Sequence, residues 1–306
     1  ADVIGKIANG IADDMLTTTI MACKCPKLIS PAMNTNMFTN PIVQDNLKKL
    51  EHYGYEIIQP DSGYLACGDT GSGKMPSEQV LLNYILRTIA KDKDMAGIKL
   101  TVTAGPTREK LDPVRFLSNN STGKMGYAIA KMAMLRGADV TLISGKVSLE
   151  PVPFVKMVDI VSAEDMYNAV IKSAKDADII IKAAAVADYR PSEVSDEKIK
   201  KKDGDMSIPL ERTKDIIGTL GSSKRDGLFL CGFSMETEHM LDNSKVKLTK
   251  KNLDMIVANN VKDAGAGFQG NTNVITMITR DHVVQLPLMD KEEAAHAILT
   301  EILSRR

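Results

Sequence analysis

The segment 99–145 constrains the fold more than any other part of this 306-residue chain. Apolar and β-branched residues at 100–103 predict a buried strand, which ends in a turn of small residues. The run STGKMG at 121–126 then opens an amphipathic helix, and residues 138–143 predict a second strand. This order is typical of a mononucleotide-binding βαβ unit, whose unpaired helix-start amides attract phosphate. The residues expected to line such a site are Gly105, Ser121 and Gly123.

The glycine spacing separates this unit from the common dinucleotide version. Seventeen residues (106–122) lie between Gly105 and Gly123, whereas the usual fingerprint keeps its glycines within six positions. The second strand ends in Ser144-Gly145 and lacks the acidic residue that would hold an NAD ribose. Tyr127 and Lys131 have the spacing of a short-chain dehydrogenase pair, but one turn of solvated helix is the favoured interpretation. An NAD(P)-dependent oxidoreductase stays open as an alternative.

Length and charge limit the class of protein. The chain is long enough for two domains, since a domain averages roughly 150 residues. It carries 39 basic and 39 acidic side chains, which argues against nucleic-acid and membrane-surface partners. Its four cysteines lack the spacing of a disulfide framework, which favours a reducing cytoplasm. No apolar run is long enough to span a membrane.

A charged stretch at 91–94 is the best linker candidate, so we expect domains at 1–94 and 95–306. The first sixteen residues show helical periodicity, with Ile4, Ile7, Ile11 and Met15 on one side. A domain that opens on an amphipathic helix, without a strand to pack on, suggests that the natural protein extends further toward its N-terminus.

The rest of the chain alternates between strand and helix patterns, which predicts an α/β protein with a Rossmann-like, doubly wound, mostly parallel sheet in the second domain. The first domain also combines strand and helix patterns. In it we expect strands at 27–30 and 55–58, helices at 46–53 and from the cap Ser77 to 89, and a glycine-rich loop at 61–76. In the second domain we expect strands at 99–103, 139–143, 178–182, 228–231, 254–258 and 273–278. Ligands of such folds bind at the carboxyl ends of the strands.

Candidate site residues follow these strand ends. The run 182–190 places Ala184 and Ala185 where small side chains let a base or substrate approach the backbone. Asp188 then stands at the rim, suited to a hydrogen-bond donor or a metal ion, although a tightly packed corner with a capping aspartate is equally open. Phe233, also at a strand end, suits stacking on a base, and core packing is the alternative.

Two lysine clusters point to a polyphosphate ligand. Residues 198–202 carry four lysines in five positions, and Lys198 can neutralise charge on a triphosphate, although most lysine runs are solvated faces. Lys247, Lys250 and Lys251 precede another strand and form a second cluster at the same sheet edge. Two such clusters favour a polyphosphate over a neutral metabolite.

Two residues of the first domain are candidates for chemistry. Cys67 lies among three glycines and near Lys74, a setting more typical of a reactive thiol than of a buried structural cysteine. Asn34 offers an amide that can fix a carboxylate. Neither residue specifies a reaction by itself.

Taken in order, these motifs resemble a known family over essentially the whole chain: the bacterial bifunctional phosphopantothenoylcysteine decarboxylase/phosphopantothenate–cysteine ligase of coenzyme A biosynthesis. The run PAMNTNMF at 31–38 is similar to a decarboxylase motif, with Phe38 where Trp or Tyr is usual. The run ACGDTGSGKM at 66–75 resembles the substrate-covering flap, with Lys74 in place of the commoner Arg. The ligase half resembles the family through TAGPTRE, DPVRFLSNNSTGKMG, AAAVADYRP, EKIKK, GF-x-x-ET and KKNLD.

For the second domain, the resemblance implies a ligase that uses CTP, Mg²⁺, 4'-phosphopantothenate and L-cysteine and passes through an acyl-cytidylate. It implies that Lys198 acts on the α-phosphate, that Asn119 holds the intermediate's carbonyl, and that Arg115 positions the acid or assists cysteine attack. The implied nucleotide and intermediate contacts are Ala184, Ala185, Asp188 (also the candidate metal ligand), Phe233, Lys247 and Lys251. The resemblance further implies a homo-oligomer built on a ligase-domain dimer.

For the first domain, the resemblance implies part of a flavodoxin-like flavoprotein domain that carries out FMN-dependent decarboxylation. It further implies that Asn34 binds the substrate carboxylate and that Cys67 is the proton donor. The family's domain begins some dozens of residues earlier, with a flavin-phosphate loop and a catalytic histidine. We therefore expect an incomplete decarboxylase half, without FMN and without activity, in this chain. A non-catalytic flavin-binding regulatory subunit is a further alternative.

Overall fold

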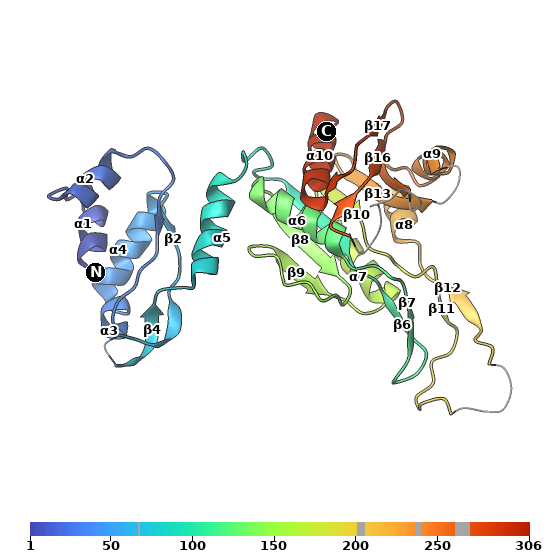
Figure 1. Ribbon diagram of the computed structural model, residues 1–306, viewed down its shortest axis with the longest axis horizontal. Helices are drawn as coiled ribbons and strands as arrows, with labels where there is room; N and C mark the ends of the chain where they lie inside the picture. The colour runs from blue at the N-terminus through green and yellow to red at the C-terminus, as the bar shows by residue number, and fades with distance from the viewer. Residues whose placement is uncertain (67, 201–205, 237–239, 261–269) are drawn as a thin grey trace. The chain divides into compact units, whose positions relative to one another are not determined.

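The computed structural model describes the chain except for residues 67, 201–205, 237–239 and 261–269, and it divides into two compact units, Ala1–Lys91 and Asp92–Arg306 (Figure 1). The first unit packs helices on a short parallel strand pair. Its elements are α1 (Asp2–Ala8), α2 (Met15–Ala22), β1 (Leu28–Ile29), α3 (Thr35–Phe38), α4 (Pro41–His52), β2 (Glu56–Ile57), β3 (Asp61–Tyr64), β4 (Thr70–Lys74) and α5 (Glu78–Ile89). Ile4 and Ile7 of α1 pack against Leu47 and Leu50 of α4 to form its core.

The prediction of one helix from the periodicity of residues 1–16 is wrong, because the structure has two helices in this region. The first helix ends at Ala8, and Gly10 then takes a φ of +72°, which turns the chain. A second helix starts after Asp14, whose carboxylate accepts a hydrogen bond from the Thr17 amide at 2.8 Å. Met15, predicted on the apolar side, is 85% exposed. A capping box thus overrides the apolar spacing.

The glycine-rich stretch 61–76 is a hairpin rather than a loop, because β3 and β4 pair antiparallel. A Cβ on Gly73 would lie 2.1 Å from the Met33 carbonyl oxygen, and one on Gly71 would lie 2.4 Å from the Thr35 hydroxyl oxygen. The glycines therefore let the hairpin pack closely on the 33–35 segment. The helix predicted after Ser77 is confirmed, with the Ser77 hydroxyl accepting from the Val80 amide.

The second unit is built on one eight-stranded sheet, in the order β17-β16-β14-β13-β10-β5-β8-β9. The strands from β9 to β14 are parallel, whereas β16 and β17 join antiparallel at one edge. Its strands are β5 (Lys99–Ala104), β8 (Asp139–Ser144), β9 (Lys156–Asp159), β10 (Ile179–Lys182), β13 (Phe229–Glu236), β14 (Met255–Asn260), β16 (Ile275–Ile278) and β17 (Val283–Gln285). The predicted α/β fold with a doubly wound, mostly parallel sheet is confirmed. The strand predicted at 273–278 is divided, since Thr272–Asn273 (β15) pairs separately with Met289–Asp290 (β18).

Helices cover both faces of this sheet and create two hydrophobic cores. The helices are α6 (Lys124–Leu135), α7 (Ala163–Ser173), α8 (Ile216–Ser222), α9 (Met240–Lys250) and α10 (Lys291–Ser304). On the first face, Ile129 of α6 and Ile298 of α10 pack with Ile181 of β10. On the second face, Met166 of α7 and Ile216 of α8 belong to the core that contains the sheet residue Ile180. Alternate residues of a strand therefore serve different cores.

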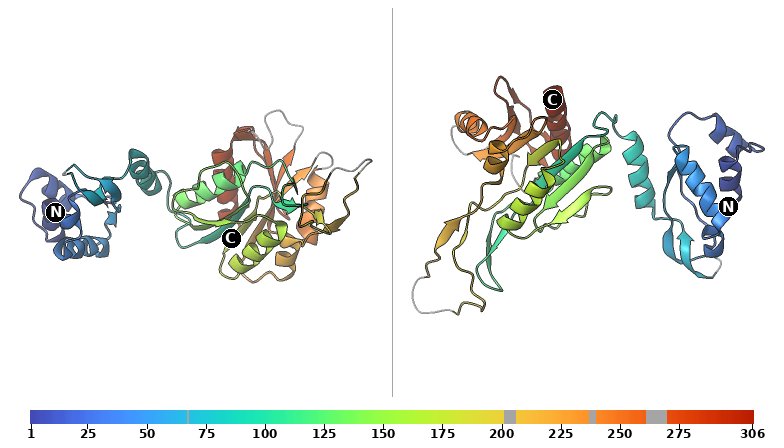
Figure 2. Two further views of the ribbon diagram at one scale, coloured as in Figure 1. Left: turned by 90° about the horizontal axis from the view of Figure 1, so that it is seen from below. Right: turned by 180° about the vertical axis from the view of Figure 1, so that it is seen from behind.

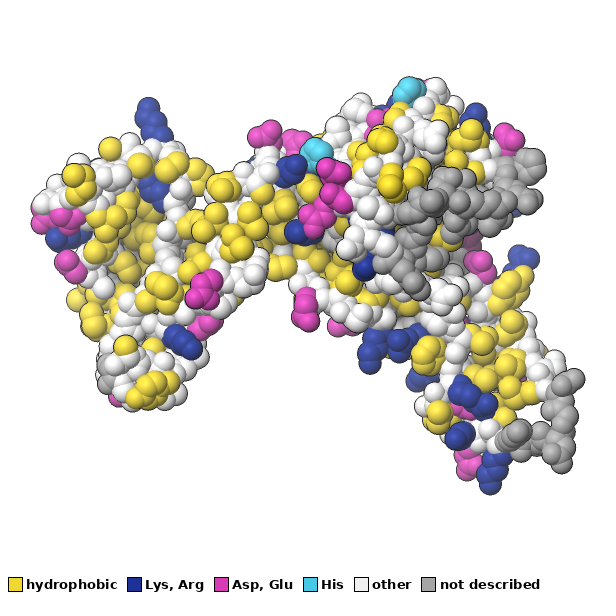
Figure 3. Space-filling view, viewed as in Figure 1, with side chains coloured by type: hydrophobic (Ala, Val, Ile, Leu, Met, Phe, Trp, Pro, Cys, Tyr) yellow, Lys and Arg dark blue, Asp and Glu magenta, His cyan; other side chains and the backbone are white. Residues whose placement is uncertain are grey.

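A two-part arm extends from the sheet, as the views in Figures 1 and 2 show. One part is the hairpin of β6 (Arg108–Lys110) and β7 (Phe116–Ser118), and the other is the ribbon of β11 (Tyr189–Pro191) and β12 (Leu210–Arg212). The Ser195 amide donates to the Leu111 carbonyl at 3.1 Å, which joins the two parts. Lysine and arginine side chains gather along this arm (Figure 3).

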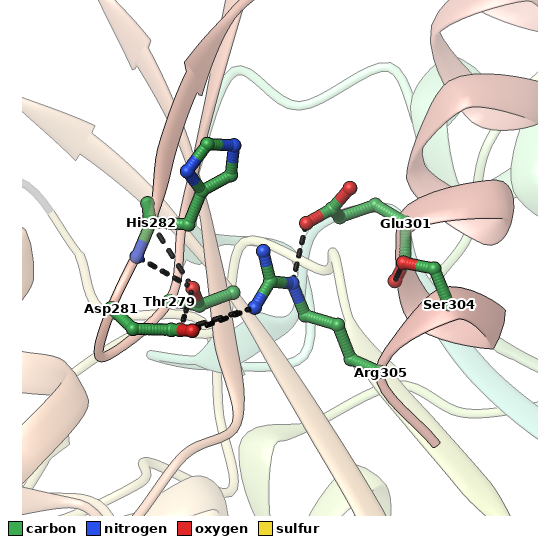
Figure 4. A network of polar contacts seen from close by, with 6 residues as sticks. All are labelled: Thr279, Asp281, His282, Glu301, Ser304 and Arg305. Atoms are coloured by element: carbon green, nitrogen blue, oxygen red, sulfur yellow. Dashed lines mark hydrogen bonds and ion pairs between the residues drawn. The ribbon is translucent and has the colours of Figure 1, made fainter.

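The last helix is fixed at its end by a polar network (Figure 4). Arg305 donates to Asp281 in the β16–β17 turn at 3.0 Å and to Glu301 one turn back at 2.5 Å. Thr279 donates to the same Asp281 carboxylate at 2.9 Å, which lowers the pKa of Asp281. The network holds α10 over the sheet face that it shares with α6. Among the described helices, none is long and apolar enough to cross a membrane.

Candidate functional site

Close backbone packing shapes the corner where β5, α6 and β8 meet. Gly105 and Gly123 have φ values of +73° and +78°, which L side chains rarely adopt. A Cβ on Gly123 would lie 3.3 Å from the Gly105 amide nitrogen, and one on Gly145 would lie 1.9 Å from the Pro106 carbonyl oxygen. A Cβ on Gly126 would likewise come within 3 Å of the Ala104 Cβ and of the Thr103 carbonyl oxygen. The glycines bring the start of α6 directly against the carboxyl end of the central strands.

The start of α6 opens into a hollow, which we call the helix pocket. It is lined by Ser121, Thr122, Gly123, Lys124, Met125, Gly126, Ala183, Ala184, Ala185, Phe233, Ser234, Met235, Asn259, Asn273 and Lys291. Gly123 is the N-cap of α6 and supplies no side-chain acceptor, and the residues of the first turn line the hollow. Lys124 and Lys291 add positive charge, and burial together with the nearby Lys124 lowers the pKa of Lys291. This environment suits an anion.

The predicted alanines form one wall of the helix pocket. The Ala184 amide donates to the Thr103 hydroxyl at 3.1 Å, and the Ala185 amide donates to the Gly105 carbonyl at 3.0 Å. The Asn119 side-chain amide donates to the Ala185 carbonyl at 3.1 Å, which brings Asn119 to the same wall. Small side chains thus leave backbone atoms accessible to a ligand. Phe233 is half-buried: it lines the helix pocket and also packs against the first core, and its stacking on a base stays a prediction.

A second hollow, which we call the lysine pocket, lies beside the carboxyl end of β10. It is lined by Lys182, Val186, Asp188, Tyr189, Arg212, Thr213, Lys214, Asp215, Ile216 and Lys251. Lys251 forms an ion pair with Asp215 at 3.0 Å. The pKa of Asp215 is lowered: burial opposes the shift, but the Gly218 amide and Lys251 outweigh it. Asp188 and Lys251, both predicted, meet here, whereas Lys182 and Asp215 were not singled out from the sequence.

Lys247 lies between these two hollows. Its ammonium is 3.4 Å from the hydroxyl of Ser234, a residue that lines the helix pocket, and it also acts electrostatically on Lys182 of the lysine pocket. The predicted second lysine cluster therefore reaches both hollows through different members.

Arg115 and Lys198 belong to the arm, and neither lines the helix pocket or the lysine pocket. Arg115 donates twice to the Asp112 carboxylate, at 2.6 and 2.9 Å, and once to the Ile199 carbonyl at 3.0 Å. Asp112 also accepts from the Ile199 amide at 3.2 Å. The Arg115 guanidinium and the backbone amides of Val114, Arg115 and Ile199 hold the pKa of the Asp112 carboxyl well below its usual range. This tie anchors Lys198, an exposed neighbour of Ile199, to the β6–β7 hairpin.

The dehydrogenase-like pair is not assembled as a catalytic pair. The Tyr127 hydroxyl lies 3.3 Å from the Ser144 hydroxyl, and the Lys131 ammonium pairs with Glu292 of α10 at 2.6 Å. Among the described residues, no group of three His, Cys, Asp or Glu side chains could hold a metal ion.

In the first unit, Asn34 lies at the β3–β4 hairpin. Its side-chain amide donates to Asp69 at 3.2 Å, and its carbonyl accepts from the Asn36 amide. The hydroxyls of Ser30 and Thr35, near Asn34 in the sequence, are buried and have no hydrogen-bond partner among the described residues. Cys67, the predicted proton donor, lies outside the described residues. Orphaned hydroxyls next to Asn34 fit a ligand that carries hydrogen-bonding atoms.

Comparison with known proteins agrees with this division of the chain. Residues 1–90 match the flavoprotein family model, and residues 95–305 match the model for the DNA/pantothenate metabolism flavoprotein C-terminal domain. The chain is 47% identical over 306 residues to the coenzyme A biosynthesis bifunctional protein CoaBC of Bacillus subtilis (strain 168), covering 99% of this chain and 75% of that protein. It is 42% identical to a cysteine/cysteine sulfinic acid decarboxylase of an unknown prokaryotic organism, covering 99% of this chain and 86% of that protein.

A solved structure resembles the second unit. The crystal structure of the C-terminal domain of a coenzyme A biosynthesis bifunctional protein CoaBC aligns with a TM-score of 0.59 and 44% sequence identity, covering 69% of this chain and 96% of that one. The two matched models place the chain among the flavoproteins of DNA/pantothenate metabolism. More particularly, the chain belongs to the CoaBC family of bifunctional proteins of coenzyme A biosynthesis.

Proposed function

We propose that residues 95–306 form a ligase domain that joins 4'-phosphopantothenate to L-cysteine at the expense of CTP, through an acyl-cytidylate. The observation that carries this proposal is the pair of cationic hollows at the carboxyl end of β10, with the anchored Lys198 segment on the neighbouring arm. Two of the substrates are phosphorylated, and the uncapped α6 start and the lysines suit phosphate groups.

The chemistry requires activation of an acid. A carboxylate does not expel hydroxide at neutral pH, so its oxygen attacks the α-phosphate of CTP and releases pyrophosphate. The cysteine amine then attacks the acyl carbon, CMP leaves, and the amine loses a proton as the amide forms. Lys198 would neutralise charge on the α-phosphate in the first step, because an ammonium placed on developing charge lowers the barrier. Asn119 would hold the intermediate's carbonyl, and Arg115 would position the acid.

The pocket residues would bind the substrates. In this proposal Gly105, Ser121 and Gly123 shape the anion site at α6, Phe233 stacks on the base, and Ala184 and Ala185 admit the intermediate. Lys247 and Lys251 would contact the base or the phosphates. Mg²⁺ keeps much of its water shell and binds with phosphates plus one or two carboxylates, so Asp188, beside Asp215, fits such an ion without a cluster of three ligands. A bound Mg²⁺ would offset phosphate charge.

We further propose that the first unit belongs to an FMN-dependent decarboxylase that acts on the ligation product. The buried hydroxyls of Ser30 and Thr35, which no residue in the described part of the chain pairs with, fit hydrogen-bonding atoms of a flavin or of the substrate. FMN would supply redox chemistry when bound, while Asn34 would fix the substrate carboxylate and Cys67 would donate a proton. The flavin absorbance band of the purified protein tests whether it retains FMN, and release of carbon dioxide from the ligation product tests decarboxylation. A ligase-domain dimer is likewise a proposal, and light scattering tests it.

Pyrophosphate release tests the ligase proposal. The protein is mixed with 4'-phosphopantothenate and Mg²⁺, with CTP or ATP, and cysteine is omitted from one arm. With CTP, we expect one turnover of pyrophosphate release in the arm without cysteine and continuous release once cysteine is present. Lys198→Met should slow the single turnover by roughly a hundredfold, whereas Lys175→Met, an exposed lysine near the opposite end of β10, serves as the control. Absence of release with either nucleotide would refute the proposal.

A further inference from the structure

Lys182 is the last residue of β10, and the strand's alternation decides where its side chain goes. Ile179 and Ile181 belong to the first core, together with the partly buried Ala183, whereas Ile180 belongs to the second core. Lys182 therefore falls on the second face, where it lines the lysine pocket next to Ile216 of α8. The residue after it, Ala183, lines the helix pocket on the other face.

The ammonium of Lys182 differs from those of Lys214 and Lys251, the other two lysines that line the lysine pocket. Lys251 pairs with Asp215 at 3.0 Å, and Lys214 pairs with Glu164 at 2.6 Å. The Lys182 ammonium has no hydrogen bond and no ion pair with any residue that the structure describes. It is thus a partly buried cation with donors to spare, and it faces a polar hollow.

This arrangement costs the free protein stability. Burial lowers the pKa of Lys182, and so do the like charges of Lys251 and Lys247, while Asp188 and Asp215 act in the opposite direction. The remaining charged groups that line the pocket, Arg212 and Lys214, are also cations. A methionine would fill the same space without the desolvation cost. The position therefore calls for a ligand that stabilises the charge.

We propose that Lys182 is a phosphate-binding residue of the ligase domain, whose ammonium contacts the phosphate chain of the nucleotide from the base of the lysine pocket. This proposal rests on the proposed nucleotide-dependent ligation and adds a contact to it. Four lining cations (Lys182, Arg212, Lys214 and Lys251) outnumber two lining carboxylates (Asp188 and Asp215), so the pocket favours an anion over a neutral base or ribose. A phosphate oxygen would satisfy the donors that no described residue satisfies.

The test separates charge from shape and phosphate from base. Three variants are compared with the native protein: Lys182→Met, which removes the charge, Lys182→Arg, which keeps it, and Lys175→Met as the exposed control. Binding of CTP and CDP is measured by calorimetry, and binding of CMP and cytidine by thermal shift. We expect Lys182→Met to weaken CTP by about ten- to hundredfold, as for loss of a hydrogen bond to a charged group. The loss should shrink as phosphates are removed and vanish for cytidine.

Lys182→Arg should retain most of the CTP affinity, and the melting temperature of each unliganded variant reports whether it folds. If Lys182→Met fails to fold, Lys182→Gln replaces it. Native affinity for CTP in the Met variant, or an equal loss for CTP and cytidine, would overturn the assignment of Lys182 to the phosphates. Failure of the native protein to bind any of the four compounds would instead refute the proposed function, and this inference with it.

Discussion

The packing of Gly126 against β5 leads to a quantitative prediction. A Cβ at this position would lie 2.6 Å from the Ala104 Cβ and 2.8 Å from the Thr103 carbonyl oxygen. Both partners belong to a strand that is hydrogen-bonded on both sides, by β10 and by β8, so the strand cannot move away. The helix must shift instead. Gly126→Ala therefore tests whether the contact between α6 and β5 is as tight as the structure shows.

Two terms of opposite sign set the magnitude. Replacing glycine by alanine in a helix is worth about 1 kcal/mol in favour of folding. Overpacking a core costs roughly 1–3 kcal/mol, and two contacts below 3 Å place this case near the upper end. The expected net loss is about 2 kcal/mol, which lowers Tm by roughly 4–8 °C in a domain of this size. Phosphate-ligand affinity should fall too, because the start of α6 moves.

Thermal unfolding followed by circular dichroism and calorimetry measures the effect. Gly5→Ala is the matched control in the first unit, since its Cβ would meet only Asn46 Nδ2 at 3.7 Å, an ordinary contact. We expect that control to melt at or above the native temperature. A Gly126→Ala variant that melts as high as the native protein would show that the clash is relieved cheaply, and the reasoning would then be wrong.

Three further predictions follow from the charges and the cysteines. Asp112→Asn should release the segment around Ile199 and speed tryptic cleavage after Lys198. The lowered pKa of Asp112 means that its tie is present above the unfolded-state pKa and is lost only as the pH falls through the lower folded value, so acidification from pH 7 to about pH 5 should not mimic the variant. Lys182→Met should raise the Tm of the unliganded protein, and an unchanged or lower Tm would argue against a desolvation cost. Burial raises the pKa of the Cys231 thiol, so iodoacetamide should label the exposed Cys23 and Cys25 and spare Cys231 until the protein unfolds, which peptide mass spectrometry checks.

The central strands were predictable because each is a short apolar run bounded by polar or glycine residues. The predicted strand at 99–103 became β5, and the one at 139–143 became β8, each within one residue. Strand β9 was missed because Lys156 and Asp159 are polar and the strand lies at the sheet edge, where burial imposes little pattern. The β3–β4 hairpin was missed because its glycines serve close packing rather than flexibility.

The residues of the candidate site could be predicted where a local run of small residues marks them. They could not be predicted where folding brings together residues that are far apart in the sequence. The small residues at 183–185 and the STGKMG run were singled out from the sequence, and both line the helix pocket. The bond from Asn119 to Ala185 spans 66 positions of sequence, which no local pattern can reveal. Lys182 was passed over because one lysine after an isoleucine run carries no signal until the sheet fixes which face it occupies.

The alternation of side chains at the end of β10 also limits how the length of this strand can change. Lys182 and Ala183 serve different hollows because neighbouring residues of a strand face opposite sides. A one-residue insertion within 179–182 would exchange them, placing a lysine against the α6 start and an alanine in the lysine pocket. A change in the length of β10 therefore keeps the lining of both hollows only if it comes in steps of two residues.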